Sequence, residues 1–229
     1  LENSSLYENL EQKVRERTKI IESQKEEIEA EKEKSEKLLL NILPTETAEE
    51  LKQTGSYKPR KYDSVTIIFT DFEGFTKISE KLTTEELVEM IDHCYKGFDR
   101  ITSKYQIEKI KTIGDAYMCV SGLPIANTNH AINAIYAAIE MHQFINEYNA
   151  ERRSKGLPYC PLRIGMHSGP VAAGVVGSKK FAYDIWGDTV NVAAHMESSG
   201  EIGMVNISET TYEGISEFFT KTCLAPSTL

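Results

Sequence analysis

The chain has 229 residues, enough for one domain with a full hydrophobic core plus an appendage. A hydrophobic content of 40% and a charged content of 27% describe an ordinary soluble protein. The formal net charge of −9 argues against a general nucleic-acid-binding protein, whose surface is normally basic, so we expect no nucleic-acid partner.

The cysteines and the hydropathy bear on the compartment. The four cysteines show no metal-ligand spacing and are expected to be reduced, core-filling thiols: Cys94, Cys119, Cys160 and Cys223. No apolar run is long enough to span a bilayer and no signal peptide is visible, so we expect no membrane contact within this chain. We expect a cytoplasmic location. Because the chain begins at Leu1 rather than Met, it is also compatible with the cytoplasmic part of a membrane-anchored receptor.

The first region, residues 1–44, is rich in Glu and Lys and predicts one long helix from about residue 6 to residue 43. Residues seven apart form a mostly apolar heptad a series: Val14, Ile21, Ile28, Ser35 and Ile42. The d series is apolar only at its ends: Leu10, Arg17, Gln24, Glu31 and Leu38. This weak seam predicts a marginally stable parallel coiled coil that could serve as a signalling helix. A single solvated helix is the alternative.

Residues 45–61 are expected to form a short helix and a linker. Pro44 ends the long helix, because proline blocks helix continuation. The short helix is predicted from Thr45 to Gln53 with Thr45 as its cap, and residues 55–61 form the polar linker. The globular domain is assigned to residues 62–229.

The stretch from Val65 to Thr76 carries the clearest chemical signal. Its β-branched and aromatic start predicts a buried central strand, which ends abruptly at Asp71. A carboxylate at the end of a buried strand is costly unless it is paired or holds a cation. Asp115 is expected at the tip of a tight turn between two later strands. Two carboxylates on adjacent strand ends suit Mg²⁺, although an Asp after a strand is often only a turn residue.

The order of the predicted elements indicates an α+β fold with a ferredoxin-like β-α-β-β-α-β core. The elements are strand 62–70, helix 84–104, strands 107–112 and 115–121, helix 128–153 and strand 160–168. We expect an antiparallel sheet with helices on one face. Glycines and Pro170 predict an extra hairpin within residues 166–176. An extra helix is predicted from Asp188-Thr189, as its cap, to about Ser199, followed by a short strand near residues 204–207.

Three motifs occur in order along the domain: Thr70–Thr76, Lys109–Met118 and Tyr183–Ala194. Together they resemble the catalytic domain of the class III adenylyl and guanylyl cyclases, the nucleotidyl cyclase family. The resemblance runs from about Glu36 to about Ile215, and three ordered motifs are far more specific than any one alone. It implies a cyclase catalytic domain that follows a signalling coiled coil and an upstream sensor.

The resemblance implies a two-metal site. Asp71 and Asp115 correspond to the metal aspartates of the family, with the backbone carbonyl of Phe72 as a further ligand. They would hold two Mg²⁺ or Mn²⁺ ions that orient a triphosphate for in-line displacement. The loop that opens the next helix would offer its backbone amides to phosphate oxygens: Phe72, Glu73, Gly74, Phe75 and Thr76.

The resemblance also implies the substrate. Lys111 and Asp184 match the family pair that reads adenine: a Lys donor suits N1, and an Asp acceptor suits the 6-amino group. The guanylyl cyclases use Glu and Cys at these places, so we expect ATP as substrate and 3′,5′-cyclic AMP and pyrophosphate as products. Asn191 matches the Asn that orients the ribose. Because family sites form between subunits and this chain carries both sets of residues, we expect a homodimer with two shared active sites.

Two departures from the family pattern predict weak turnover. His195 stands where the family has an Arg that stabilises the developing charge on the transferred phosphate, and a histidine is shorter and only partly protonated. A purely structural histidine is the alternative. The family also continues into a C-terminal hairpin with a phosphate-binding Lys, whereas Lys221 lacks that context. Both departures affect the triphosphate side of the site.

Other functions stay open at this point. One is a catalytically impaired nucleotide-binding or dimerisation module for signalling, and another is a guanylyl cyclase. A diguanylate cyclase is disfavoured, because the chain lacks the Gly-Gly-acid-acid-Phe motif. A nucleic-acid polymerase is disfavoured by the acidic balance.

Overall fold

The structure, a computed structural model, describes residues 2–177 and 180–220, with side chains from residue 10 onward. The chain forms two compact units, Leu1–Ser56 and Tyr57–Leu229. No helix in the described part of the chain combines the length and the apolar character needed to cross a membrane.

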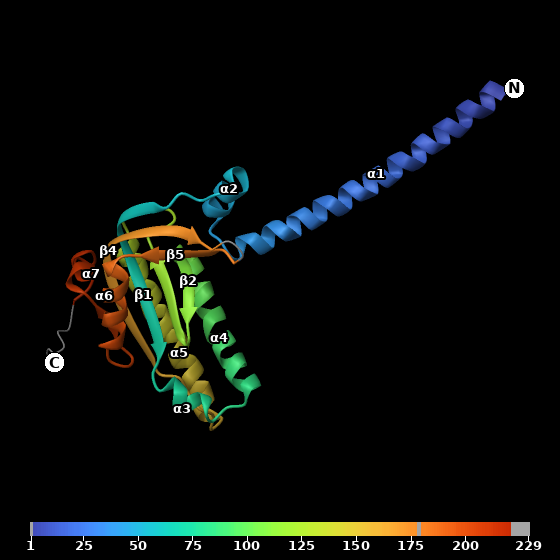
Figure 1. Cartoon of the computed structure of the whole chain (residues 1–229). Coiled ribbons are helices and arrows are strands. Elements are labelled where there is room, and N and C mark those ends of the chain that lie inside the picture. Colours follow the sequence, from blue (N-terminus) through green and yellow to red (C-terminus); the bar gives the residue numbers. More distant parts are fainter. Residues whose placement is uncertain (1, 178–179, 221–229) are drawn as a thin grey trace. The chain divides into compact units, whose positions relative to one another are not determined.

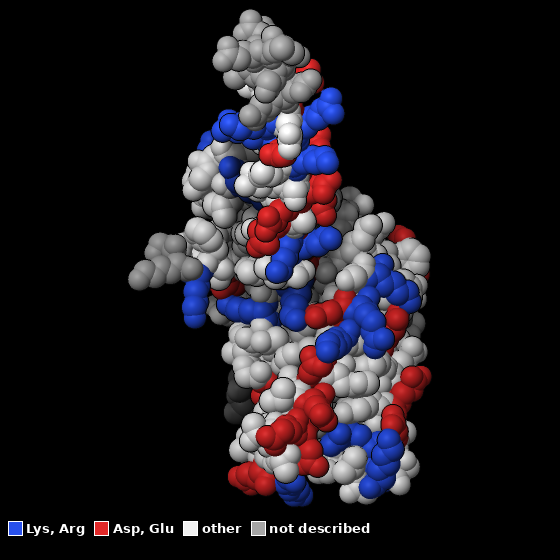
Figure 2. Space-filling view, turned by 90° about the vertical axis from the view of Figure 1, so that its right-hand side faces the viewer, with Lys and Arg blue, Asp and Glu red and all other residues white. Residues whose placement is uncertain are grey.

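The first unit consists of the long helix α1 (Glu2–Leu40) and the short helix α2 (Thr45–Thr54). The predicted a positions of α1 are exposed in the single chain, with Val14 at 55% and Ile28 at 67%. The coiled coil therefore stays a prediction. Figure 2 shows basic and acidic side chains interspersed on the side of the molecule that it displays, as expected for solvated faces.

The expected cap of α2 is wrong. Pro44, in an extended conformation with φ −55° and ψ 146°, occupies the N-cap position, and the helix has no side-chain cap. Since proline is already extended at the helix boundary, the chain enters α2 without help from Thr45. Gly55 ends the helix in a left-handed conformation and donates its N–H to the carbonyl of Leu51.

The second unit is built on one sheet with the strand order β2-β3-β1-β4-β5, to which β6 is added beside β4. The strands are β1 (Arg60–Phe72), β2 (Ile107–Ile113), β3 (Ala116–Ser121), β4 (Leu162–Val176), β5 (Ala182–Trp186) and β6 (Val205–Ile207). The helices are α3 (Phe75–Ser79), α4 (Thr84–Lys104), α5 (His130–Ser154), α6 (Asp188–Ser198) and α7 (Glu209–Glu213). The β-α-β-β-α-β order is confirmed, and neighbouring strands are antiparallel except for the parallel pair β4–β6.

Helices α4 and α5 cover one face of the sheet (Figure 1). Alternate residues of β1 and β4 point into this core, where Ile68 and Ile164 are fully buried with Phe98 of α4 and Met141 of α5. Full burial of each such side chain stabilises the fold by about 1.5–3 kcal/mol. The predicted start of α4 is confirmed: Thr83 accepts from the N–H of Glu86 at 3.2 Å, and the Glu86 carboxylate accepts from the N–H of Thr83 at 2.8 Å.

The hairpin predicted within residues 166–176 is wrong, because β4 runs through this stretch as one 15-residue strand. The hairpin lies later, where β4 turns into β5 and Ala172–Val176 pairs with Ala182–Trp186. The glycines mark close contacts instead of a turn: a Cβ on Gly165 would lie 1.9 Å from the backbone nitrogen of Glu197 in α6. Pro170 sits where the β1–β4 register shifts, so its missing N–H breaks no regular ladder.

Helix α6 packs against the face of the sheet opposite α4 and α5, which we call the α6 face. Helices therefore cover more than the one face that we expected. The expected cap of α6 is also wrong: Gly187 is the N-cap and there is no side-chain cap. The hydroxyl of Thr189 instead donates to the carbonyl of Pro170 at 2.6 Å, which fastens the start of α6 to β4.

Candidate active site

Asp71 and Asp115 lie close together at the end of the sheet where β1 ends and β3 begins. Strands β1 and β3 are neighbours, and Gly114-Asp115 is the two-residue turn of the β2–β3 hairpin. Gly114 has φ +63°, a conformation that glycine adopts without strain. The Asp115 carboxylate lies near the Asp71 carboxylate and the backbone N–H of Phe72. Burial and the charge of Asp71 raise the pKa of Asp115.

Arg163 of β4 joins three acids around this turn. It is the ladder partner of Asp71 and donates from Nη2 to the Asp71 carboxylate at 2.9 Å. Its Nη1 lies 2.9 Å from Glu73, and its Nε lies 3.1 Å from Glu197 of α6. Burial and the charge of Asp71 raise the pKa of Glu197, whereas Arg163 lowers it. We call these four residues together with Asp115 the metal cluster.

The metal cluster contains more negative than positive charge. It has four carboxylates, Asp71, Glu73, Asp115 and Glu197, and one guanidinium, that of Arg163, which contacts all of them except Asp115. Within the described residues no group of three or more His, Cys, Asp or Glu side chains is arranged so that it could hold a metal ion. Two carboxylates with excess negative charge nevertheless fit Mg²⁺, which keeps water or substrate phosphates as its other ligands. Arg163 and Glu197 were not predicted from the sequence, although the register of β1 and β4 identifies Arg163 as a neighbour of Asp71.

Part of the loop from Phe72 to Thr76 is hydrogen-bonded or packed within the domain. The N–H of Glu73 donates to the carbonyl of Pro161 at 2.9 Å, so this amide does not face a ligand, contrary to expectation. The side chains of Phe72 and Phe75 pack in or against the core. Gly74 is the N-cap of α3 with φ +71°, so the amides that follow it begin the helix without intrahelical partners.

Lys111 of β2 and Asp184 of β5 form an ion pair, with Nζ 2.6 Å from Oδ2. The other Asp184 oxygen accepts from the N–H of Ile185 at 2.9 Å, which fixes the carboxylate. Strands β2 and β5 stand at opposite ends of the strand order, yet they contact each other, so the β4–β5 hairpin reaches across the α6 face. We call Lys111 and Asp184 the base-edge pair.

A β-bulge in β2 turns Lys111 toward Asp184. The register shifts between the pairs Lys109–Cys119 and Lys111–Met118, so Ile110 is an extra residue. Cys119 belongs to the core beneath α4 and α5, which places Lys109 on that face and Lys111 on the α6 face. Without the bulge the two lysines would point the same way. Bulges often re-aim a side chain in this manner beside active sites.

Helix α6 carries Asn191 and His195 one turn apart, and both residues are exposed. The carbonyl of His195 accepts from the N–H of Ser199 at 3.0 Å, but its imidazole makes no hydrogen bond to any described residue. In the single chain the imidazole is exposed, and the role of His195 stays a prediction. Lys221, which lacks the sequence context of the family's C-terminal hairpin, lies outside the described residues.

The metal cluster and the base-edge pair are separate groups within the described chain. No hydrogen bond or ion pair between described residues joins Lys111 or Asp184 to the metal cluster. The structure brings together Asp71 with Asp115, and Lys111 with Asp184, as the sequence analysis expected.

Comparison with known proteins gives a consistent family. Residues 57–228 match the model of the family described as adenylate and guanylate cyclase catalytic domain. The chain is 41% identical over 216 residues to guanylate cyclase 32E of Drosophila melanogaster, which covers 94% of this chain and 18% of that protein. It is 39% identical over 193 residues to an adenylate cyclase of Mycobacterium tuberculosis, covering 84% of this chain and 43% of that protein. The chain thus spans less than half the length of these relatives.

Solved structures agree with these sequence relatives. The guanylyl cyclase domain of the RhoGC fusion protein from the aquatic fungus Blastocladiella emersonii, described as a non-canonical dimer, matches with a TM-score of 0.67 and 34% identity, over 72% of this chain and 90% of that one. The adenylyl cyclase CyaB from P. aeruginosa matches with a TM-score of 0.67 and 28% identity, over 71% and 84% respectively. Similar proteins therefore include enzymes named for each of the two nucleotides.

Proposed function

The chain belongs to the family of adenylate and guanylate cyclase catalytic domains, and we propose that it is an adenylyl cyclase that converts ATP into 3′,5′-cyclic AMP and pyrophosphate. The 3′-oxygen of the ribose attacks the α-phosphorus as the bond to the pyrophosphate leaving group breaks, and the 3′-hydroxyl proton is released. Because relatives of both kinds match, the substrate has to be argued from this chain's own residues.

The base-edge pair is the observation that carries the proposal. Adenine presents an acceptor at N1 and a donor at its 6-amino group, and guanine presents the reverse. Lys111 donates, and the Asp184 oxygen that now accepts from it can accept from the 6-amino group. Since Asp184 is only 18% exposed and is held by the N–H of Ile185, it is positioned before the base arrives. A guanine here would leave its N1 donor facing Lys111, which disfavours GTP.

Asp71 and Asp115 would hold two Mg²⁺ or Mn²⁺ ions, with the carbonyl of Phe72 as a further ligand. Bound ions of this kind orient the triphosphate and stabilise the negative charge that develops in the displacement. The excess of carboxylates in the metal cluster supports this role, because it favours cations; burial and then the charge of Asp71 raise the pKa of Asp115. Arg163 holds Asp71 and Glu73 in place, and Gly74, Phe75 and Thr76 offer their amides to the triphosphate.

We assign each active site to two copies of the chain. The metal cluster of one protomer faces the base-edge pair, Asn191 and His195 of its partner, and two-fold symmetry then makes two sites. Asn191 orients the ribose, and His195 lies toward the triphosphate. The exposed heptad positions of α1 support this arrangement, because they suit a parallel pair of helices. An upstream sensor would act through α1.

A second candidate function is a nucleotide-binding signalling module with impaired turnover. His195 favours it, because an exposed imidazole replaces a permanently charged group near the transferred phosphate. The deciding experiment assays the purified chain with ATP and with GTP, each with Mg²⁺ and with Mn²⁺. We expect cyclic AMP from ATP, with a higher kcat/KM than for GTP. Preferential turnover of GTP would identify a guanylyl cyclase, and metal-dependent ATP binding without product would identify the signalling module.

A further inference from the structure

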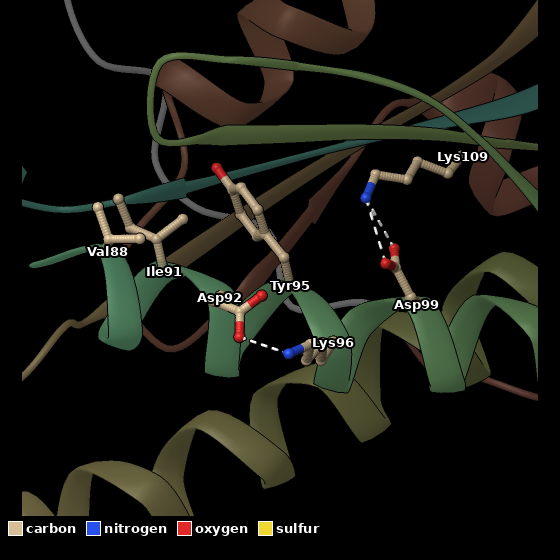
Figure 3. Close-up of a pocket in the computed structure, with 7 residues that line it drawn as sticks. All are labelled: Val88, Ile91, Asp92, Tyr95, Lys96, Asp99 and Lys109. Carbon is tan, nitrogen blue, oxygen red and sulfur yellow. Dashed lines mark hydrogen bonds and ion pairs between the residues drawn. The ribbon is translucent and has the colours of Figure 1, made fainter. Parts of the chain in front are cut away.

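Tyr95 of α4 reaches the turn that carries Asp115. Its hydroxyl donates to the carbonyl of Gly114, with the two oxygens 3.3 Å apart. Gly114 and Asp115 are the two residues of the β2–β3 turn, so this bond ends next to one of the two metal aspartates. Figure 3 shows Tyr95 rising from α4 toward the hairpin.

The ring of Tyr95 is held in place by its neighbours. Its centroid lies 5.5 Å from that of Tyr117 and 6.4 Å from that of Phe98, and the ammonium of Lys109 lies 5.8 Å from it. Lys109 is 3.0 Å from Asp99, which also accepts from the Tyr117 hydroxyl at 2.6 Å. Helix α4 is thus fastened to the middle of the hairpin by Asp99 and to its tip by Tyr95.

The opposite side of Tyr95 is open. Tyr95 lines a cavity of about 320 Å³ together with residues of α4 and β2 (Figure 3): Val88, Ile91, Asp92, Lys96, Asp99 and Lys109. Asp92 pairs with Lys96 at 2.7 Å, and neither side chain bonds to Tyr95. The hydroxyl contact with Gly114 is therefore the polar contact that sets the direction of the phenol.

The turn itself has few other restraints. A Cβ at Gly114 would meet nothing within 4 Å, so no side chain or backbone packs on that side of the residue. Asp115 lies beside the like charge of Asp71. Burial and the charges of Asp115, Cys94 and Asp71 raise the pKa of Tyr95 to about 12, so the phenol stays protonated and remains a donor.

We propose that Tyr95 is a positioning residue that holds the Gly114-Asp115 turn against β1, so that Asp115 and Asp71 can share divalent ions. This inference rests on the proposed function of Asp71 and Asp115 as metal ligands. Tyr95 touches neither the nucleotide nor the metal and acts through the carbonyl of Gly114.

The test compares Tyr95→Phe with the matched control Tyr105→Phe. Both variants keep the aromatic ring and lose one hydroxyl. The Tyr105 hydroxyl donates to Glu140 at 2.8 Å. Tyr105 follows α4 directly and lies at the opposite end of the β2–β3 hairpin from Asp115. Mn²⁺ binding is measured by electron paramagnetic resonance in the presence of 3′-deoxy-ATP, which lacks the attacking hydroxyl. Amide exchange of Asp115 and Ala116 and the Mg²⁺ dependence of cyclisation complete the readout.

We expect Tyr95→Phe to weaken Mn²⁺ binding by about 2- to 10-fold, the range that one net hydrogen bond gives, and to speed amide exchange at the turn. The Mg²⁺ concentration for half-maximal activity should rise by a similar factor, with a smaller change in the KM for ATP. Tyr105→Phe should behave like the wild type. Unchanged Mn²⁺ affinity in Tyr95→Phe, or an equal loss in Tyr105→Phe, overturns the proposal. A wild type that binds Mn²⁺ but makes no cyclic nucleotide contradicts only the proposed function, because the Mn²⁺ affinities still decide the role of Tyr95.

Discussion

The metal cluster and the base-edge pair lie on the same sheet but differ in how their charges are balanced. In the metal cluster three carboxylates share the guanidinium of Arg163. Asp115 is the fourth carboxylate, and burial and the charge of Asp71 raise its pKa. In the base-edge pair one ammonium meets one carboxylate at 2.6 Å. The metal cluster carries excess negative charge, whereas the base-edge pair has no net charge.

This difference matches the two ligands that we propose. Excess negative charge attracts cations. A neutral pair with fixed donor and acceptor positions attracts no ions and can select a base by hydrogen bonding. The metal cluster should therefore destabilise the metal-free protein, and the base-edge pair should not. Strain and repulsion at a site that binds a ligand are a common cost of function.

The largest effect should follow from removing charge from the metal cluster. We expect Asp71→Asn or Asp115→Asn to lower cyclisation by more than about 10³-fold, because each removes a ligand charge from a site that needs both. Initial rates of cyclic AMP formation at saturating Mg²⁺ and Mn²⁺ measure this, with circular dichroism to confirm folding.

The control for this prediction is Asp92→Asn, which removes a carboxylate of α4 that pairs only with Lys96 on the surface. It should leave the rate within about twofold of the wild type, since exposed ion pairs contribute little. Most of the activity remaining in a folded Asp71 or Asp115 variant would show that these residues are not metal ligands.

The base-edge pair should control the choice of nucleotide. The double variant Lys111→Glu with Asp184→Cys exchanges donor and acceptor, so we expect the ratio of kcat/KM for ATP and GTP to fall by about 10²-fold or more. Lys111→Glu alone places a second carboxylate beside Asp184 and should reduce turnover of both nucleotides. An unchanged ratio in a folded and active double variant would remove the base-edge pair from substrate selection.

A smaller gain is expected at His195. We expect His195→Arg to raise kcat about tenfold or more, with less change in the KM for ATP, because a permanently charged fork stabilises charge that appears in the transition state. Ser103→Arg, at an exposed position near the end of α4, adds the same charge away from α6 and is the control. No gain from His195→Arg in a folded dimer would mean that His195 does not limit turnover.

The smallest effect concerns stability without metal. The pKa of Asp115 is higher in the folded protein than in the unfolded chain, so the folded state holds this proton more tightly. Stability from this group is present below the ordinary carboxyl pKa of about 4 and is lost as pH rises through the raised folded value. Asp115→Asn removes this loss, and we expect its melting temperature at pH 7.5 without metal to equal or exceed that of the wild type. Scanning calorimetry with and without Mg²⁺ measures both melting temperatures. Mg²⁺ should raise the melting temperature of the wild type more than that of Asp115→Asn. A clearly lower melting temperature of the variant without metal would contradict this prediction.

Local sequence signals located the strand end at Asp71 and the turn at Asp115, because a β-branched run and a glycine turn act over a few residues. The meeting of Lys111 with Asp184 came from the family resemblance and is present in the structure. Arg163 could not be assigned to Asp71 without the β1–β4 register, which joins residues 92 apart in sequence. The glycines of β4 were interpreted as a hairpin because their actual cause, the close approach of α6, is a tertiary contact. The bulge at Ile110 likewise has no local signal.

The central claim is that each active site combines the metal cluster of one protomer with the base-edge pair of its partner. The most direct test mixes an Asp71→Asn chain with an Asp184→Ala chain, each inactive alone, and purifies the heterodimer with two different affinity tags. We predict that the heterodimer recovers about half of the wild-type activity per dimer, because one of its two sites is intact. A verified heterodimer that stays as inactive as its two parents would contradict the shared site.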